Sequence, residues 1–248
     1  MRTSPRGTPA DHTWNSEVSS GFALAGFLTL VFVAFTLLAM GPLAKFDAYF
    51  TLAPVPEAWT PFLHVLDRIG QRAVCLPVLA VATYVVCRRQ RSWRPAVVGA
   101  VSVFMLNLIV LLLKLGLGRE GPHTVDPSFF NGGMAYPSGH SSNIVLVYGL
   151  VAYLVSRYHS PSRRLRVLLW GVVVLLSVTM VITSVSLDWH WFADLVAGLI
   201  VGGIVLQLTV TVDHAVPAAE FGQGWRRGLR DLVGETRTGK SQQPRTPV

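Results

Sequence analysis

Six long apolar segments constrain the fold of this chain more than any other feature of its sequence. A helix needs roughly 20 residues to cross about 30 Å of hydrocarbon, and each segment approaches that length. The chain is 51% hydrophobic and only 14% charged, a balance too apolar for an ordinary soluble domain. We therefore predict an all-α integral membrane bundle with six transmembrane helices. The segments are 22–40, 73–87, 95–113, 139–155, 167–182 and 195–212.

The second segment is short for a membrane span. We expect its helix to extend back over Leu66 and Ile69, with the long side chains of Arg68 and Arg72 reaching to the interface. The first segment is expected to be a retained helix, because it is longer than the apolar part of a secretory signal and lacks a small-residue cleavage site. One membrane domain, 21–213, is then flanked by cytoplasmic tails, 1–20 and 214–248.

The basic residues predict the orientation of the bundle. Sixteen of the 21 lysines and arginines fall in the two tails and in the loops after the second and fourth segments. By the positive-inside rule both termini are cytoplasmic, and the other loops face outward. The location expected is a plasma membrane, of bacterial type. The same rule accounts for the net charge of +8, so no nucleic-acid partner is expected. The remaining five basic residues are Lys45, Arg68, Arg72, Lys114 and Arg119.

Two polar groups stand at the ends of the third and fourth segments. Lys114 and Arg119 lie in the stretch KLGLGREGP, where the third segment ends. The sequence Tyr-Pro-Ser-Gly-His, ending at His140, opens the fourth segment, with Ser138 as the expected N-cap. The free backbone N–H groups of Gly139 and His140 would then point outward, where a helix N-terminus attracts phosphate oxygens.

A third group enters the sixth segment. His190 and Asp194 are four residues apart, a spacing that places both on one face of a helix. A carboxylate in that position keeps one imidazole nitrogen protonated and leaves the other as a nucleophile. Because the third segment ends outside and the fourth and sixth begin there, all three groups reach the same surface. Charged groups at membrane depth are costly, so we treat them as functional candidates.

Each group also has a purely structural interpretation. Lys114 and Arg119 could anchor the end of a helix, and His140 could be an ordinary residue at a helix start. The pair formed by His190 and Asp194 could be a bond between helices. The combination of all three groups at one surface favours the catalytic interpretation.

The three groups resemble the motifs of the type 2 phosphatidic acid phosphatase family, which shares its core with vanadium haloperoxidases. The family pattern is K-x6-R-P, then P-S-G-H, then S-R-x5-H-x3-D. Pro-Ser-Gly-His ending at His140 matches the second motif in full, and His190 with Asp194 matches the end of the third. Lys114 and Pro122 match the ends of the first. The resemblance implies an acid phosphatase and haloperoxidase-like helical core.

The chain departs from that pattern at both motif arginines. Gly121 stands at the first arginine position, and Thr183 with Ser184 stands where the serine-arginine pair is expected. Arg119 is a candidate replacement for one of these arginines, and Ser184 or Thr183 is a candidate donor of a hydroxyl hydrogen bond to phosphate. Lys114 remains as a phosphate ligand of the first motif. The phosphate site is therefore expected to be altered.

The resemblance implies a lipid phosphatase that works without metal or cofactor. His190 would attack phosphorus, Asp194 would orient it, and His140 would protonate the leaving alcohol, through a phosphohistidine at the extracytoplasmic face. Phosphate would be bound by Lys114, Arg119, Ser138, Gly139 and Ser184. The expected partner is a lipid phosphate such as phosphatidic acid, phosphatidylglycerol phosphate or a polyprenyl diphosphate. Two alternatives remain open: a phosphotransferase or diesterase of the same superfamily, and a non-catalytic lipid-binding membrane protein.

Overall fold

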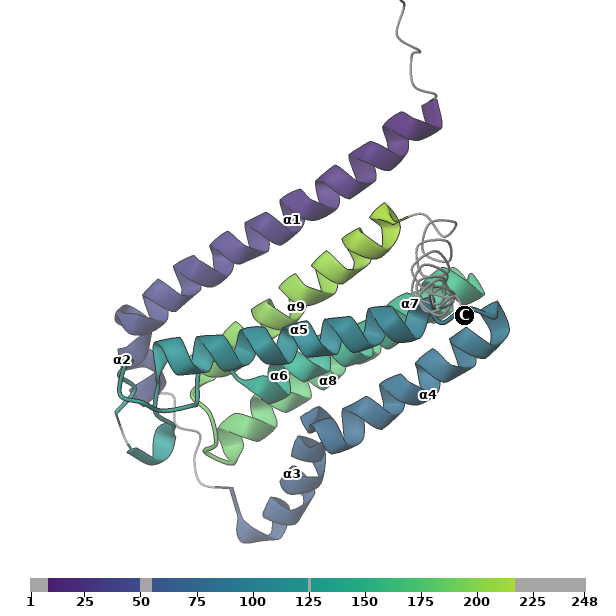
Figure 1. The fold of residues 1–248 in the computed structure, drawn as a ribbon. Helices are drawn as coiled ribbons and strands as arrows, with labels where there is room; N and C mark the ends of the chain where they lie inside the picture. The colour runs from purple at the N-terminus through teal and green to yellow at the C-terminus, as the bar shows by residue number, and fades with distance from the viewer. Residues whose placement is uncertain (1–8, 50–54, 125, 217–248) are drawn as a thin grey trace, which may run out of the picture.

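The computed structural model describes residues 9–49, 55–124 and 126–216, and these residues form helices and no strands (Figure 1). Most of the helices are joined by short turns, whereas residues 126–138 form a longer loop before α6. In order, they are α1 (Pro9–Met40), α2 (Pro42–Tyr49), η1 (Glu57–Trp59), α3 (Thr60–Asp67), η2 (Arg68–Gly70), α4 (Arg72–Gln90), α5 (Arg94–Leu117), η3 (Pro122–Thr124), α6 (Gly139–Asn143), η4 (Ile144–Tyr148), α7 (Gly149–His159), α8 (Arg163–Ser186) and α9 (Phe192–Ala215).

Six helical segments of the described chain are long and apolar enough to cross a membrane. Each contains one of the apolar segments identified in the sequence, so the prediction of a six-span all-α membrane protein is confirmed. The fourth is continuous through α6, η4 and α7. The predicted cytoplasmic tails lie mainly outside the described residues, although α1 already begins at Pro9. The spans are Ser16–Met40, Arg72–Gln90, Arg94–Thr124, Gly139–His159, Arg163–Ser186 and Phe192–Ala215.

The start of the second span differs from the prediction. α4 begins at Arg72 and does not extend back over Leu66 and Ile69, which belong to α3 and η2. The backbone is extended at Gln71 (φ −73°, ψ 142°), which ends the preceding turn and makes Gln71 the N-cap of α4. The prediction was wrong because the chain turns after Gly70, so Leu66 and Ile69 belong to separate short helices before α4 at the end of the bundle.

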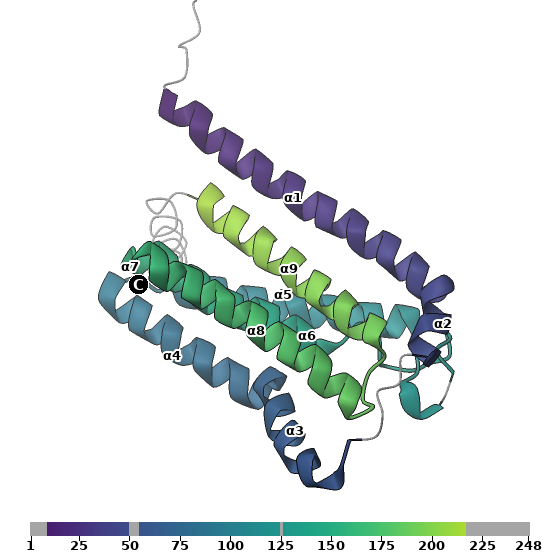
Figure 2. The ribbon, with the colours of Figure 1, turned by 180° about the vertical axis from the view of Figure 1, so that it is seen from behind.

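The two ends of the bundle differ in what they bring together. The start of α1, the α4–α5 connection and the end of α9 lie at one end in both views (Figures 1 and 2). At the opposite end lie α2, α3, the end of α5 and the α8–α9 connection. All three motif groups are at this second end, which we call the site end.

Helix α9 packs closely against α6. A Cβ at Gly198 would lie 2.4 Å from the carbonyl oxygen of Ser138, and one at Gly202 would lie 2.6 Å from that of Ser142. Only glycine permits these backbones to approach so closely. The sequence Gly-x-x-x-Gly therefore does more than general helix packing, because it places the start of α6 directly beside α9.

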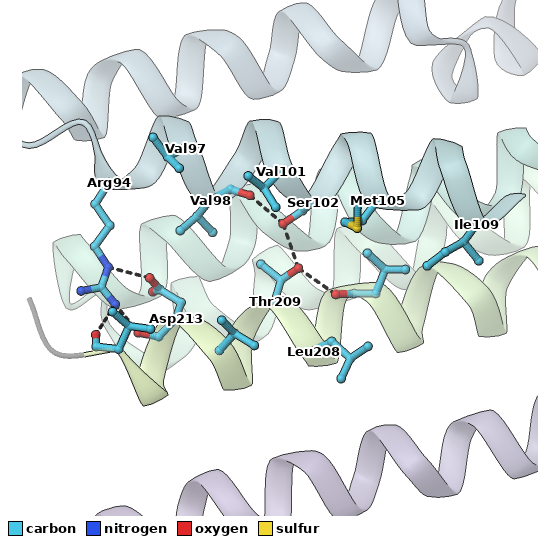
Figure 3. A pocket seen from close by; sticks show the side chains of 13 residues that line it. Arg94, Val97, Val98, Val101, Ser102, Met105, Ile109, Leu208, Thr209 and Asp213 are labelled. Atoms are coloured by element: carbon cyan, nitrogen blue, oxygen red, sulfur yellow. Dashed lines mark hydrogen bonds and ion pairs between the residues drawn. The ribbon is translucent and has the colours of Figure 1, made fainter. Parts of the chain in front are cut away.

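At the end away from the site, a buried ion pair joins α5 to α9. Arg94 Nε lies 2.7 Å from Asp213 Oδ1, and Tyr153 Oη donates to Asp213 Oδ2 at 2.5 Å. An apolar groove runs from this pair along α5 and α9, and a hydrogen bond of 2.8 Å between Ser102 and Thr209 crosses it (Figure 3). The groove is lined by residues of these two helices and by Val216, which follows α9, and contains no residue of the three motif groups.

Candidate active site

The end of α5, the start of α6 and the start of α9 meet at the site end. The backbone N–H of Ser138 donates to the carbonyl oxygen of Asp194 at 2.9 Å, which ties the second motif group to the third. Lys114 Nζ donates to the carbonyl oxygen of Met134, in the loop that leads to α6. His140 interacts electrostatically with both Lys114 and His190. The structure thus brings together groups that are up to 80 residues apart in the sequence.

His190 is held by Asp194. The Nδ1 atom of His190 lies 3.3 Å from Asp194 Oδ2, and the imidazole is only 13% exposed. The contact expected from the spacing is present, but the expected reason for it was wrong. α9 begins at Phe192, so His190 precedes the helix, and the Asp194 carboxylate reaches back over the helix start. The same Oδ2 accepts the backbone N–H of Trp191 at 3.1 Å.

This geometry assigns separate functions to the two imidazole nitrogens. With Nδ1 facing the carboxylate, Nε2 of His190 is the nitrogen that remains available to a ligand. A carboxylate on one ring nitrogen also stabilises positive charge that develops on the ring. His190 therefore has the surroundings of a nucleophilic histidine.

Arg119 lies behind Asp194 and is fully buried. Its guanidinium donates at 2.7 Å to Asp194 Oδ1 and at 2.7 Å to Asp47 Oδ2, while Nε donates to the carbonyl oxygen of Pro127 at 2.9 Å. All three nitrogens are thus used within the protein. In this structure the side chain orients Asp194 and does not face the space in front of His190.

Asp47 completes this buried group from α2. Its Oδ1 accepts the backbone N–H of Ala193 at 3.1 Å, which fixes the first turn of α9. Burial raises the pKa of the Asp47 carboxyl, and the hydrogen bond and charge of Arg119 oppose that rise. Nearby Tyr136, whose hydroxyl is 2.7 Å from that of Thr36, has its pKa raised to about 12, mainly by burial.

The second histidine faces a different carboxylate. His140 Nε2 lies 3.6 Å from Oδ2 of Asp67. Asp67 is the last residue of α3 and is fully buried. Gln71 Nε2 donates to the same oxygen at 3.3 Å, and Ser184 Oγ lies 3.5 Å from the other. Ser184 itself is fully buried and also contacts the sulfur of Met180.

The helix start at Ser138 has the predicted form. The Ser138 side chain accepts the backbone N–H of Ser141, at 3.5 Å, so its assignment as N-cap of α6 is confirmed. The side chain is fully buried in that role. The backbone N–H groups of Gly139 and His140 have no acceptor among the described residues, which leaves them available to an anion at this helix start.

Arg72 adds a further cation at the site end. It is the first residue of α4 and is exposed. The charge of its guanidinium acts on both Lys114 and His140. No hydrogen bond or ion pair joins it to any residue that the structure describes. Its place beside the two predicted site residues makes it a better candidate than Arg119 for contact with an anionic ligand.

Sequence reasoning did not identify Asp47, Asp67 or Arg72 as parts of this site. The two aspartates carry a detectable signal, because each is an isolated acid within a few residues of an apolar span and such acids are costly unless paired. Arg72 was interpreted only as an interfacial residue. Within the described ranges, no group of three or more His, Cys, Asp or Glu side chains is arranged to hold a metal ion.

Comparison with known proteins gives a family match and a fold match. A family model described as the PAP2 superfamily matches residues 95–216, the range that contains all three motif groups. Residues 95–216 of this chain are therefore similar to the PAP2 superfamily. No curated protein matches the sequence significantly.

A solved structure shares the fold. It is the crystal structure of a transmembrane PAP2-type phosphatidylglycerolphosphate phosphatase from Bacillus subtilis, with a TM-score of 0.63 and 17% sequence identity. The match covers 78% of this chain and 98% of that one. The six-helix architecture of this chain is therefore that of a known membrane protein fold, and the match to the superfamily supports a phosphatase activity.

Proposed function

We propose that this chain is a membrane lipid phosphatase that hydrolyses a phosphate monoester or a diphosphate of a lipid through a phosphohistidine at His190. The observation that carries the proposal is the contact of His190 Nδ1 with Asp194, beside a second histidine at a helix start with free backbone N–H groups. The membrane setting favours a lipid such as phosphatidic acid, phosphatidylglycerol phosphate or a polyprenyl diphosphate as the substrate.

In the first step Nε2 of His190 attacks phosphorus in line. An N–P bond forms while the bond from phosphorus to the leaving oxygen breaks. The electron pair of that bond stays on the oxygen, which takes a proton from His140. Asp194 stabilises the positive charge that develops on the His190 ring, and preorganised charge of this kind is usually the largest catalytic contribution.

In the second step water gives a proton to the neutral His140 and attacks the phosphohistidine. The P–O bond forms as the N–P bond breaks, so phosphate is released and both histidines are regenerated. Lys114, Arg72 and the backbone N–H groups of Gly139 and His140 hold the phosphoryl oxygens in this proposal. Arg119 and Ser184 take positioning roles instead of the ligand roles expected from the sequence, because both side chains are buried against carboxylates.

The proposed location of the site is the extracytoplasmic surface. The connections rich in arginine lie at the opposite end of the bundle from the histidines, and the positive-inside rule assigns that end to the cytoplasm. A lipid phosphate in the outer leaflet would then reach His190 without crossing the membrane.

A second candidate is a phosphotransfer or diesterase reaction at the same histidines. Gly121 and Ser184 occupy both positions where the family motifs have arginine, and Ser184 faces the Asp67 carboxylate. The reduced positive charge favours a phosphoryl group with a single negative charge, as in a diester. Supplying a lipid or sugar acceptor and following the phosphoryl group separates the two candidates, because transfer leaves phosphate only on the acceptor.

Phosphate release by purified protein in detergent, with excess chelator, tests the proposal. We expect wild-type protein to release phosphate from lipid phosphates, and His190→Ala and Asp194→Asn to lose that activity. His123→Ala is the matched control, since this histidine is exposed at the same end and belongs to none of the motif groups. An acid-labile, base-stable phosphoryl label at His190 should appear in wild type. Activity unchanged in His190→Ala would contradict the mechanism, and absence of activity in wild type would favour the non-catalytic lipid-binding alternative.

A further inference from the structure

The carboxylate of Asp67 is buried and close to a single basic side chain. Asp67 has no exposed surface, and among the described residues His140 is the one basic residue within ion-pair distance of it. Its hydrogen-bond partners, Gln71 and Ser184, are neutral. Burying a carboxylate without a permanently charged cation beside it costs free energy, so the presence of Asp67 at this position requires an explanation.

Backbone packing fixes the distance between Asp67 and His140. A Cβ at Gly70 would lie 3.1 Å from both Cβ and the carbonyl oxygen of His140, so η2 lies directly against α6. Asn143 Nδ2 donates to the carbonyl oxygen of Gly70 at 3.2 Å, which adds a second connection. The contacts of Gly70 with α6 thus hold Asp67, three residues earlier in the chain, close to His140.

The two histidines are therefore arranged in parallel ways. His190 has Asp194 on its Nδ1, and His140 has Asp67 on its Nε2. The facing carboxylate leaves Nδ1 of His140 as the ring nitrogen available to a ligand. Other charged groups also act on His140: Lys114 from α5, Arg72 from α4 and His190 from the α8–α9 connection. Asp67 is the one carboxylate among the described groups that act on His140.

We propose that Asp67 is a positioning residue that holds His140 as the proton donor for the leaving oxygen, and that the preferred substrate is a lipid phosphomonoester with an alcohol leaving group. This proposal rests on the phosphatase function proposed above. An alkoxide is a poor leaving group and requires a proton as the P–O bond breaks, whereas the lipid monophosphate that leaves when a diphosphate is attacked is stable without one. Nδ1–H of His140 supplies that proton, and Asp67 stabilises the charged imidazolium before transfer.

The rate of the first turnover tests this, because it isolates P–O cleavage from the later attack of water. Enzyme in excess is mixed with an alkyl phosphate or with a p-nitrophenyl phosphate that carries a similar alkyl chain, and the released alcohol or nitrophenol is measured by rapid quench. General acid catalysis contributes about 10²- to 10⁴-fold for a poor leaving group. We expect Asp67→Asn to slow alkyl phosphate cleavage by about tenfold or more and to change nitrophenyl phosphate cleavage by less than about twofold.

Three further variants make the result interpretable. Asp67→Asn in a His140→Ala background should cause no additional loss, because Asp67 acts through His140. Asp126→Asn, at an exposed acid of the same end, should leave both rates unchanged. His190→Ala should abolish both. If Asp67→Asn is not monodisperse in detergent, Asp67→Ser is used in its place.

The outcomes separate this proposal from the phosphatase function. Equal loss on both substrates in Asp67→Asn, or an additional loss in the His140→Ala background, would show a merely structural role and overturn the positioning role. A wild-type enzyme that cleaves lipid diphosphates faster than phosphomonoesters would overturn the substrate class. Full activity in His190→Ala would overturn the phosphatase mechanism itself.

Discussion

Replacing Gly198 with alanine tests the close packing of α9 on α6. The new Cβ would lie 2.4 Å from the carbonyl oxygen of Ser138, and ordinary contacts begin at 3.4 Å, so the two helices must separate by about 1.0 Å. The contacted atom is backbone, so no change of rotamer relieves the clash. The hydrogen bond from Ser138 N–H to the Asp194 carbonyl oxygen, now 2.9 Å long, would be broken by that separation.

Both stability and catalysis should respond. Overpacking costs about 1–3 kcal/mol and a lost hydrogen bond about 0.5–1.5 kcal/mol, so the free energy of unfolding should fall by about 2–4 kcal/mol. A displacement of about 1 Å between catalytic groups lowers the rate by about 10²-fold. The stability effect is measured by thermal unfolding in detergent, and the catalytic effect by kcat/KM for phosphate release.

Gly203→Ala provides the matched control for this experiment. Gly203 lies on the same helix, but a Cβ there meets no atom within 4 Å. It should unfold at the wild-type temperature or slightly above it, because alanine favours a helix more than glycine does. Equal stability and equal rates in Gly198→Ala and Gly203→Ala would refute the close backbone contact, and with it our account of how the motifs are held together.

Three other substitutions test individual contacts. Arg72→Ala should raise KM for lipid phosphates several-fold, because it removes a cation beside Lys114 and His140. Arg68→Ala, at another exposed arginine of the same end, should not. Equal KM values in the two variants would remove Arg72 from the phosphate site. Arg119→Met leaves Asp194 without its buried cation, so unfolding free energy should fall by about 3–5 kcal/mol, and unchanged thermal unfolding would contradict the buried ion pairs. Ser138→Ala removes an N-cap worth about 1 kcal/mol, which a lowered unfolding temperature would detect and a wild-type value would disprove.

Much of the fold was predictable because the membrane imposes local rules. Apolar length identifies the six spans. Because the chain crosses the membrane once in each span, the starts of the fourth and sixth spans lie on the same side, which places His140 and His190 at one end. The start of α4 was not predictable in this way, since the extended backbone at Gln71 ends the preceding turn and hydropathy does not show where the backbone leaves the helical conformation. A turn of this kind depends on contacts with α6, which hydropathy does not contain.

The site was predictable where a motif specified it. His190, Asp194 and the N-cap Ser138 follow from local spacing, although the contact to Asp194 uses the helix start and not a shared helix face. The contacts of Arg119 with carboxylates could not be predicted, because one of them is made with Asp47, which is 72 residues away and belongs to no motif. Asp67 was missed because its partner His140 is also distant in the sequence and Asp67 belongs to no motif.

The position of Arg119 between Asp47 and Asp194 affects how this protein can be divided. Asp47 precedes residue 95, where the match to the superfamily begins. A chimera that retains all three motifs but exchanges the first two helices would leave the guanidinium with one counter-charge and the first turn of α9 without its acceptor. The smallest portion that can be transplanted with its chemistry intact therefore begins well before the recognised family segment.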